Sequence, residues 1–138
     1  MTYVVLAVLA AATVAGLAYR ARYGRLRASG VDLPPGLLPP AGDGRGAGGS
    51  VVLLHFSSAT CAPCRQVRAV CADVAGDLDG VRHVEVDADE HLDAVRRLDI
   101  WRLPTLLVVD RRGRVARRTV GVPDRAALRR TVTEVLAS

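Results

Sequence analysis

The sequence contains few aromatic residues and no lysine. Its 19 basic residues are all arginine, and its five aromatic residues are Tyr3, Tyr19, Tyr23, Phe56 and Trp101. Five arginines against two aspartates give residues 1–50 a charge of +3, and fourteen arginines against twelve acidic residues give residues 51–138 a charge of +2. Recognition of nucleic acid needs a basic face with interleaved aromatic residues. We therefore expect no nucleic-acid partner.

Cysteine is also scarce, which argues against a structural metal site. Cys61 and Cys64 form a C-x-x-C pair, and a structural zinc site usually takes four ligands from two such pairs. The other candidate ligands form no second pair: Cys71, His55, His83 and His91. We therefore expect no bound metal.

Residues 2–19 contain no charged side chain. As a helix they would be ~27 Å long, close to the ~30 Å hydrocarbon core of a bilayer. A cleavable signal peptide is the alternative. Signal peptides have a basic segment ahead of the apolar run, whereas only Met1 and Thr2 precede the apolar run here. We expect residues 1–19 to form a retained transmembrane anchor, with tyrosines at its two ends in the interfacial layers.

Four arginines follow this anchor, at positions 20, 22, 25 and 27. The positive-inside rule places such a cluster, and the domain after it, on the cytoplasmic side of the membrane. Binding of anionic headgroups is a second explanation for the same arginines. Pro-Pro pairs and glycines make the rest of residues 20–50 typical of a linker, which we expect to hold the domain away from the membrane.

Residues 51–138 are typical of one small α/β domain. Short apolar runs predict strands, and helically spaced apolar residues predict helices. The strands are expected near 50–56, 81–87, 104–110 and 114–120, and the helices near 61–78, 89–100 and 123–137. The order β-α-β-α-β-β-α implies parallel first strands joined by crossover helices and a final antiparallel hairpin.

The C-x-x-C pair allows three interpretations: half of a zinc site, a structural disulfide or a redox pair. A permanent disulfide is disfavoured in a reducing cytoplasm. At a helix start, unpaired amides and the helix dipole favour the thiolate, which is the nucleophile. We expect Cys61 at such a start, with Thr60 as N-cap and Pro63 in the first turn. Cys61 would then attack the substrate, and Cys64 would resolve the mixed disulfide.

Three features together resemble the thioredoxin family over residues 51–138. They are the C-x-x-C between a strand and a helix, the segment R-L-P-T-L-L-V-V-D with Pro104 placed 40 residues after Cys64, and Gly121 after the last strand. The resemblance implies a thioredoxin-like α/β fold with a mixed four-stranded sheet flanked by helices. Thioredoxin begins with a further strand and helix, so this domain looks trimmed to a smaller core.

The resemblance also implies a thiol–disulfide oxidoreductase that reduces protein disulfides. It would need no cofactor beyond the Cys61–Cys64 disulfide, and its electrons would come from a thioredoxin-reductase-like donor or a membrane electron carrier. Pro104 would be cis, and the backbone of Leu103 would pair with the substrate chain. Substrate-binding residues would then be Leu103, Pro104, Ala62 and Pro63.

The sequence departs from the family pattern around the cysteines. Thr60 and Ser57 replace tryptophans, His55 replaces a buried aspartate, and His83 replaces a lysine. We expect burial to keep His55 neutral, so that it can accept a proton from Cys64. Both histidines could equally be ordinary strand residues. Cys71 is expected to be a packed core thiol.

Two other functions are compatible with the sequence. An extracytoplasmic thiol–disulfide protein, of the kind that supports cytochrome maturation or thiol oxidation, would keep the chemistry and reverse the topology. A non-catalytic adaptor would use a thioredoxin-like surface only to bind a partner near the membrane, and the intact C-x-x-C with its proline argues against it.

Overall fold

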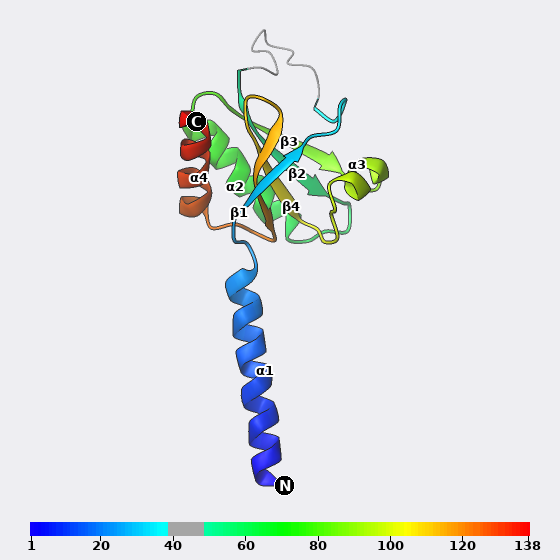
Figure 1. The fold of residues 1–138 in the computed structure, drawn as a ribbon, viewed down its shortest axis with the longest axis vertical. Coiled ribbons are helices and arrows are strands. Elements are labelled where there is room, and N and C mark those ends of the chain that lie inside the picture. Colours follow the sequence, from blue (N-terminus) through cyan, green and yellow to red (C-terminus); the bar gives the residue numbers. More distant parts are fainter. Residues whose placement is uncertain (39–48) are drawn as a thin grey trace.

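The computed structural model describes residues 1–38 and 49–138, which form four helices and five strands. In chain order these are α1 (Thr2–Arg22), β1 (Arg27–Asp32), β2 (Val51–Ser57), α2 (Cys64–Asp77), β3 (Val81–Asp87), α3 (Leu92–Arg97), β4 (Thr105–Val109), β5 (Arg114–Val120) and α4 (Arg125–Ala137). Helix α1 projects from a domain built from all the other elements (Figure 1).

The strands form one mixed sheet in the order β1-β5-β4-β2-β3. Strands β2 and β3 are parallel, whereas β2–β4, β4–β5 and β5–β1 are antiparallel. Every residue of β2 is buried, as expected for an apolar run at the centre of a sheet. The predicted thioredoxin-like fold is confirmed in its sheet type, its helices and the order of the elements after residue 50.

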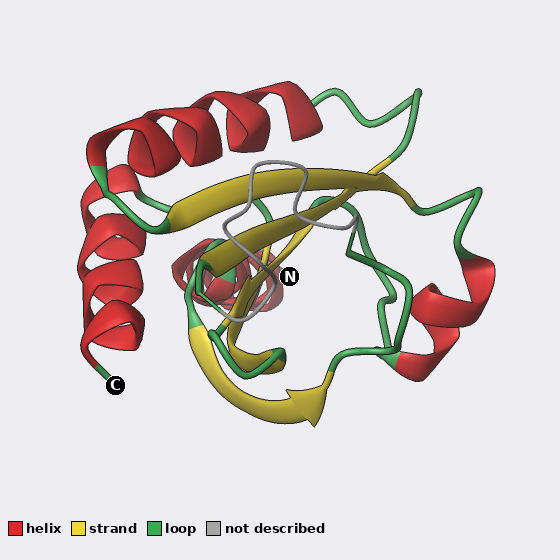
Figure 2. Cartoon of the chain, turned by 90° about the horizontal axis from the view of Figure 1, so that it is seen from above, coloured by secondary structure: helices red, strands yellow, loops and turns green. Residues whose placement is uncertain are grey.

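Helices cover both faces of the sheet (Figure 2). On one face α2 and α4 pack against alternate residues of β2, Val51 and Leu53 among them. On the other face, α3 and residues 33–38 pack against Val52, Leu54 and Phe56. Helix α2 buries Cys64, Val67, Cys71 and Val74, which recur at helical spacing on one side.

The sheet has five strands, so the prediction of four is wrong. Strand β1 comes from residues assigned to the juxtamembrane segment, and it pairs antiparallel with β5, for example Val31 with Val115. Without β1, strand β5 would present a row of unpaired backbone groups at the edge of the sheet. Most of β1 is exposed, so its sequence lacks the apolar alternation by which a half-buried strand is recognised.

The Pro/Gly segment that we expected to be a linker and to hold the domain away from the membrane is part of the domain where the structure describes it, since β1 pairs with β5 and residues 33–38 pack on the sheet. Helix α1 continues to Arg22, and the amide of Gly24 already donates to the Val120 carbonyl at 2.7 Å. Gly24 has φ +78°, and a Cβ there would overlap the Val122 carbonyl, so this close approach requires glycine. Residues 39–48, with the second Pro-Pro pair, lie outside the described residues.

Helix α1 has no buried residue. In the part of the chain that the structure describes, it is the one helix long and apolar enough to cross a membrane, with a mean hydropathy of 1.9. Length and composition thus agree with the expected anchor, as they would for a signal sequence.

Candidate functional site

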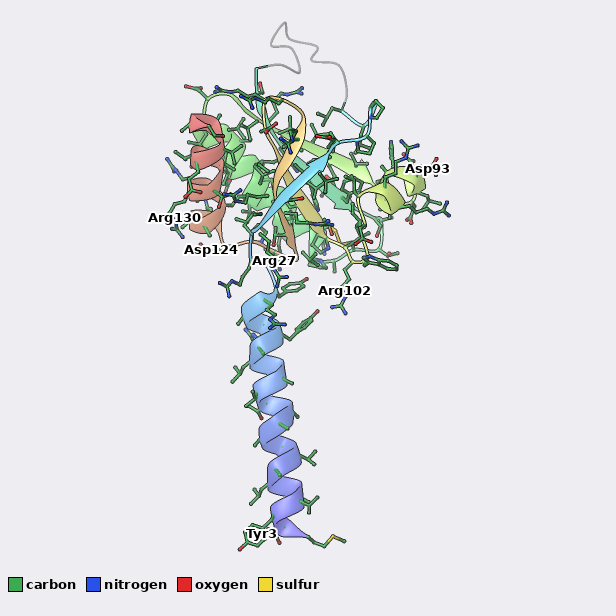
Figure 3. The ribbon with its side chains drawn as sticks, in the orientation of Figure 1. Tyr3, Arg27, Asp93, Arg102, Asp124 and Arg130 are labelled. Atoms are coloured by element: carbon green, nitrogen blue, oxygen red, sulfur yellow. A yellow bond between two sulfur atoms is a disulfide. The ribbon has the colours of Figure 1, made fainter. Side chains whose placement is uncertain are left out.

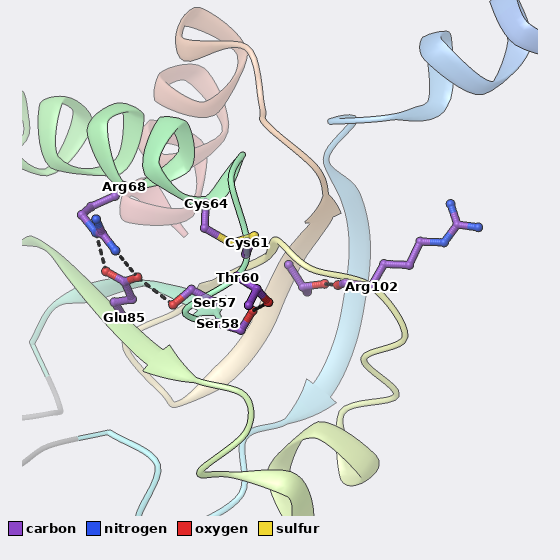
Figure 4. The surroundings of a disulfide bond; sticks show 9 residues. Ser57, Ser58, Thr60, Cys61, Cys64, Arg68, Glu85 and Arg102 are labelled. Carbon is purple, nitrogen blue, oxygen red and sulfur yellow. Dashed lines mark hydrogen bonds and ion pairs between the residues drawn. A yellow bond between two sulfur atoms is a disulfide. The ribbon is translucent and has the colours of Figure 1, made fainter.

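Cys61 and Cys64 form a disulfide where β2 leads into α2, with their Cα atoms 5.4 Å apart (Figure 4). Cys64 is buried and is the first residue of α2. Cys61 is partly exposed in the turn before the helix, where its carbonyl accepts from the amide of Cys64 at 3.3 Å. The more exposed residue of the pair is therefore the one that we expected to attack the substrate.

Two local predictions at this helix start are wrong. Helix α2 begins at Cys64 and not at Cys61, with Pro63 as the residue before it, and no side chain caps its first amides. The Thr60 hydroxyl lies 3.4 Å from the Ser58 hydroxyl instead. The C-A-P-C turn forms its own hydrogen bonds and so delays the helix by three residues.

The loop before β4 lies at the same end of the sheet as the disulfide. The antiparallel register of β2 and β4 places Thr105 opposite Phe56, just before the cysteine turn. The Leu103–Pro104 peptide bond is cis, as the resemblance implied. Pro104 is buried and accepts a hydrogen bond from the amide of Gly121 at 2.8 Å, whereas Leu103 stays half-buried. Of the other two predicted substrate-binding residues, Ala62 is exposed and Pro63 is half-buried.

His55 lies on β2 beneath α2 and is fully buried. Among the described residues neither of its ring nitrogens has a hydrogen-bond partner. Burial lowers the pKa of His55 to about 4, although the negative charge of Glu85 opposes this shift. The ring is therefore neutral at pH 7, in agreement with the expectation from the sequence.

His83 lies beside His55, with the two rings stacked at 5.9 Å between centroids. Burial lowers the pKa of His83 as well. His55, the predicted proton acceptor, and His83, the other histidine that departs from the family pattern, are thus brought together under α2, and burial disfavours the charged form of each. His91 lies apart from them, exposed before α3, with its Nδ1 3.0 Å from the carbonyl of Asp87.

An ion pair that the sequence pattern did not predict lies next to these histidines. Arg68 of α2 donates two hydrogen bonds to the Glu85 carboxylate, at 2.6 and 2.7 Å, and the Ser57 hydroxyl donates a third at 2.7 Å (Figure 4). The hydrogen bonds from Arg68 are the main reason that the pKa of Glu85 falls to about 2. Glu85 follows His83 by two residues on β3, so an acidic residue on the face of the strand that packs under a helix was the available signal.

Cys71 is packed in the core between α2 and the sheet, as expected. Burial raises the pKa of its thiol to about 12, so it stays protonated and unreactive at neutral pH. Within residues 1–38 and 49–138 no three histidine, cysteine or acidic side chains are arranged to hold a metal ion.

Comparison with known proteins agrees with this geometry. The family model described as thioredoxin matches residues 47–134. The chain is 31% identical over 88 residues to thioredoxin H2-1 of Oryza sativa subsp. japonica, a match that covers 64% of this chain and 62% of the rice protein. The chain thus spans less than two thirds of that relative.

Solved structures show the same fold. Chloroplastic thioredoxin z is 26% identical with a TM-score of 0.57, and the match covers 65% of this chain and 81% of that one. A putative thiol:disulfide interchange protein DsbE from Chlorobium tepidum is 23% identical with a TM-score of 0.63, and the match covers 81% of this chain and 99% of the other.

Proposed function

The chain belongs to the thioredoxin family, and from this premise we propose that it is a membrane-tethered thiol–disulfide oxidoreductase that reduces protein disulfides. The observation that carries the proposal is the Cys61–Cys64 disulfide, with Cys61 partly exposed and Cys64 buried. This arrangement lets a substrate reach Cys61, and the sulfur of Cys64 is close enough to form a disulfide with Cys61 afterwards.

The reaction proceeds in two exchanges. In the reduced protein the Cys61 thiolate attacks one sulfur of the substrate disulfide, which forms a mixed disulfide and releases the first substrate sulfur as a thiolate that takes up a proton. The Cys64 thiol then loses its proton and attacks the Cys61 sulfur. The second substrate thiol leaves, and two electrons have passed from the protein to the substrate. A thioredoxin-reductase-like donor or a membrane electron carrier would restore the dithiol.

His55 supports the second exchange in this proposal. Loss of a proton from Cys64 is costly in a partly apolar site, and neutral imidazole can accept it. With a pKa near 4, His55 holds the proton less well than an ordinary histidine does. Its contribution to the rate should therefore fall at the low end of what general bases provide, about 100-fold or less.

The tether is α1, and the arginines at 20, 22, 25 and 27 support a cytoplasmic position for the domain. A reporter that fluoresces only in the cytosol, fused after Ser138, should be fluorescent. A dark reporter on an intact fusion protein would favour the extracytoplasmic alternative, with the same chemistry on the other side of the membrane.

The activity is tested with the full chain in detergent. Pre-reduced protein should reduce insulin disulfides, and Cys61→Ser should abolish the reaction. Cys64→Ser should accumulate mixed disulfides with the substrate, detected by mass spectrometry under non-reducing conditions, whereas Cys61→Ser should accumulate none. An inactive wild-type protein would favour the adaptor, and mixed disulfides on Cys64 in the Cys61→Ser variant would reverse the assigned roles.

A further inference from the structure

The end of the sheet that carries the disulfide is also the end to which α1 is attached. Directly after α1, the amide of Gly24 donates to the carbonyl of Val120 at the end of β5. The next residue, Gly121, donates from its amide to the carbonyl of Pro104. Two backbone hydrogen bonds therefore connect the end of the anchor to the loop beside the disulfide.

Side chains hold α1 against the same loop. The guanidinium of Arg102 donates to the Tyr19 hydroxyl at 2.7 Å and lies 5.7 Å from the centre of its ring. Tyr23 stacks on Tyr19 with 6.0 Å between centroids, and a Cβ at Gly121 would overlap the Tyr23 ring. Arg102 points from the domain toward α1, one residue before Leu103 (Figure 3). The anchor thus fixes the orientation of the disulfide end instead of leaving it free to rotate.

The length of α1 sets the height of this contact in a bilayer. Its 21 residues span ~31 Å, about the thickness of the ~30 Å hydrocarbon core. The last turn, with Tyr19, then lies at the interface, where tyrosine is favoured. Arg102 is bonded to Tyr19, so it lies in the headgroup layer, which is roughly 5 to 7 Å thick on each side. The disulfide end of the domain therefore faces the membrane surface.

The charge of this end suits that position. A hollow of about 340 Å³ between α1 and the domain is lined by one acidic residue, Asp99, and by five arginines: Arg22, Arg25, Arg27, Arg102 and Arg118. None of these arginines has an ion pair in the described part of the chain. Anionic headgroups attract such a cluster by about 1 kcal/mol per arginine near the surface. Trp101, beside Arg102, is 85% exposed, and tryptophan is favoured in the interfacial layer.

We infer that the substrates are disulfides in the membrane-proximal segments of integral membrane proteins. The inference rests on the proposed function and specifies its substrate class. A disulfide within or just above the headgroup layer can reach Cys61 beneath the domain. A disulfide far above the membrane meets the opposite end of the domain, and a folded soluble protein is kept out of the gap by its size.

The test compares two substrates with one transmembrane helix each, co-reconstituted with the pre-reduced full chain in nanodiscs. In the near substrate a two-cysteine disulfide loop directly follows the membrane span. In the far substrate a rigid helical spacer of ~20 residues raises the same loop by ~30 Å. Single-turnover rates, measured as loss of protein thiols, should be at least tenfold higher for the near substrate. Random insertion affects both substrates equally.

A variant with an eight-residue Gly/Ser insertion between Tyr23 and Gly24 should lose this preference, because it separates the domain from α1. The same insertion between Arg112 and Gly113, in the turn at the other end of the sheet, should keep it. In detergent all proteins should reduce both substrates alike. Equal rates in nanodiscs, or a preference that survives the insertion after Tyr23, overturn the inference and leave the function standing. Inactivity toward both substrates in detergent overturns the function itself.

Discussion

His55 is a buried polar side chain at the centre of the sheet whose two ring nitrogens have no partner among the described residues. A buried polar group without a hydrogen bond costs roughly 1–3 kcal/mol. An apolar residue on β2 would avoid this cost and pack equally well against α2. A buried residue beneath α2 that lowers stability therefore calls for a functional explanation, and a role in proton transfer is the one proposed above.

The kinetics of His55 variants test that role. We expect His55→Ala to slow the release of substrate from the mixed disulfide by about tenfold to 100-fold, and to change the rate of its formation much less. Stopped-flow measurement of both steps separates them. His55→Asp should recover part of the rate, since a carboxylate also accepts a proton. If release is unchanged in a folded His55→Ala protein, the residue is only a packing residue.

The lowered pKa of His55 also predicts how stability depends on pH. Its pKa is about 4 in the folded protein and near 6.5 in the unfolded chain, so between these values the unfolded state binds more protons. Protonation of His55 in the unfolded chain therefore lowers the free energy of unfolding as the pH falls from 6.5 to about 4. The total loss is about 3 kcal/mol, and above pH 6.5 there is none. His83, whose pKa is also lowered, acts in the same direction.

Urea unfolding between pH 7 and pH 4 measures this loss. His55→Leu should reduce the slope of the unfolding free energy against pH. His91→Leu, which removes an exposed histidine away from His55, is the matched control for the substitution. Equal slopes in the wild type and in His55→Leu would mean that His55 already titrates normally in the folded protein.

At the scale of the element, α4 has a clear start. Asp124 precedes the helix in an extended conformation, and its carboxylate accepts from the amide of Ala127 at 2.9 Å. Asp124→Ala should lower the unfolding free energy by about 1 kcal/mol, and Asp124→Asn should keep most of it. Thermal and urea denaturation check this. Asp79→Ala, at an exposed site, is the control and should change stability by less than about 0.5 kcal/mol.

The contrast between β2 and β1 shows which elements the sequence could predict. Strand β2 is buried on both faces, so its continuous apolar run predicts a strand. The C-x-x-C then predicts the turn that follows it. Strand β1 is exposed and is held by backbone hydrogen bonds to β5, which leave no trace in side-chain pattern. The sequence pointed to Cys61, Cys64, Pro104 and His55, because each replaces or matches a residue of a familiar motif. The structure shows the disulfide and the cis bond before Pro104, and the role of His55 stays a prediction.

The ion pair between Arg68 and Glu85 was not predicted, for another reason. Each residue lies on its own element as an ordinary charged side chain, and only the packing of α2 over β3 brings the two together. The Thr60 cap was expected from residue type alone, and the hydrogen bonds of the cysteine turn prevailed over that local preference. Contacts between side chains of different elements are thus the part of the site that could not be predicted from the sequence.

At the scale of the whole molecule, the domain extends upstream of residue 51. A fragment that begins at Gly24 keeps β1 and the buried Leu37, whereas one that begins at Val51 loses both and exposes the edge of β5. We expect the shorter fragment to be less stable by about 2 kcal/mol or more, from the loss of Leu37 alone. Its exposed edge should also promote self-association, which analytical ultracentrifugation would detect. Equal urea midpoints and two monomeric fragments would contradict this.

The short connection between α1 and the domain determines which concentration sets the rate of encounter with substrate, that per volume or that per membrane area. For the membrane-protein substrates inferred above, and with α1 in a bilayer as proposed, both partners would diffuse in two dimensions, and the rate would follow the number of molecules per area of membrane. Diluting proteoliposomes with buffer should leave the turnover rate unchanged. Fusing them with protein-free vesicles, which spreads the same molecules over more lipid, should lower it in proportion to the added surface.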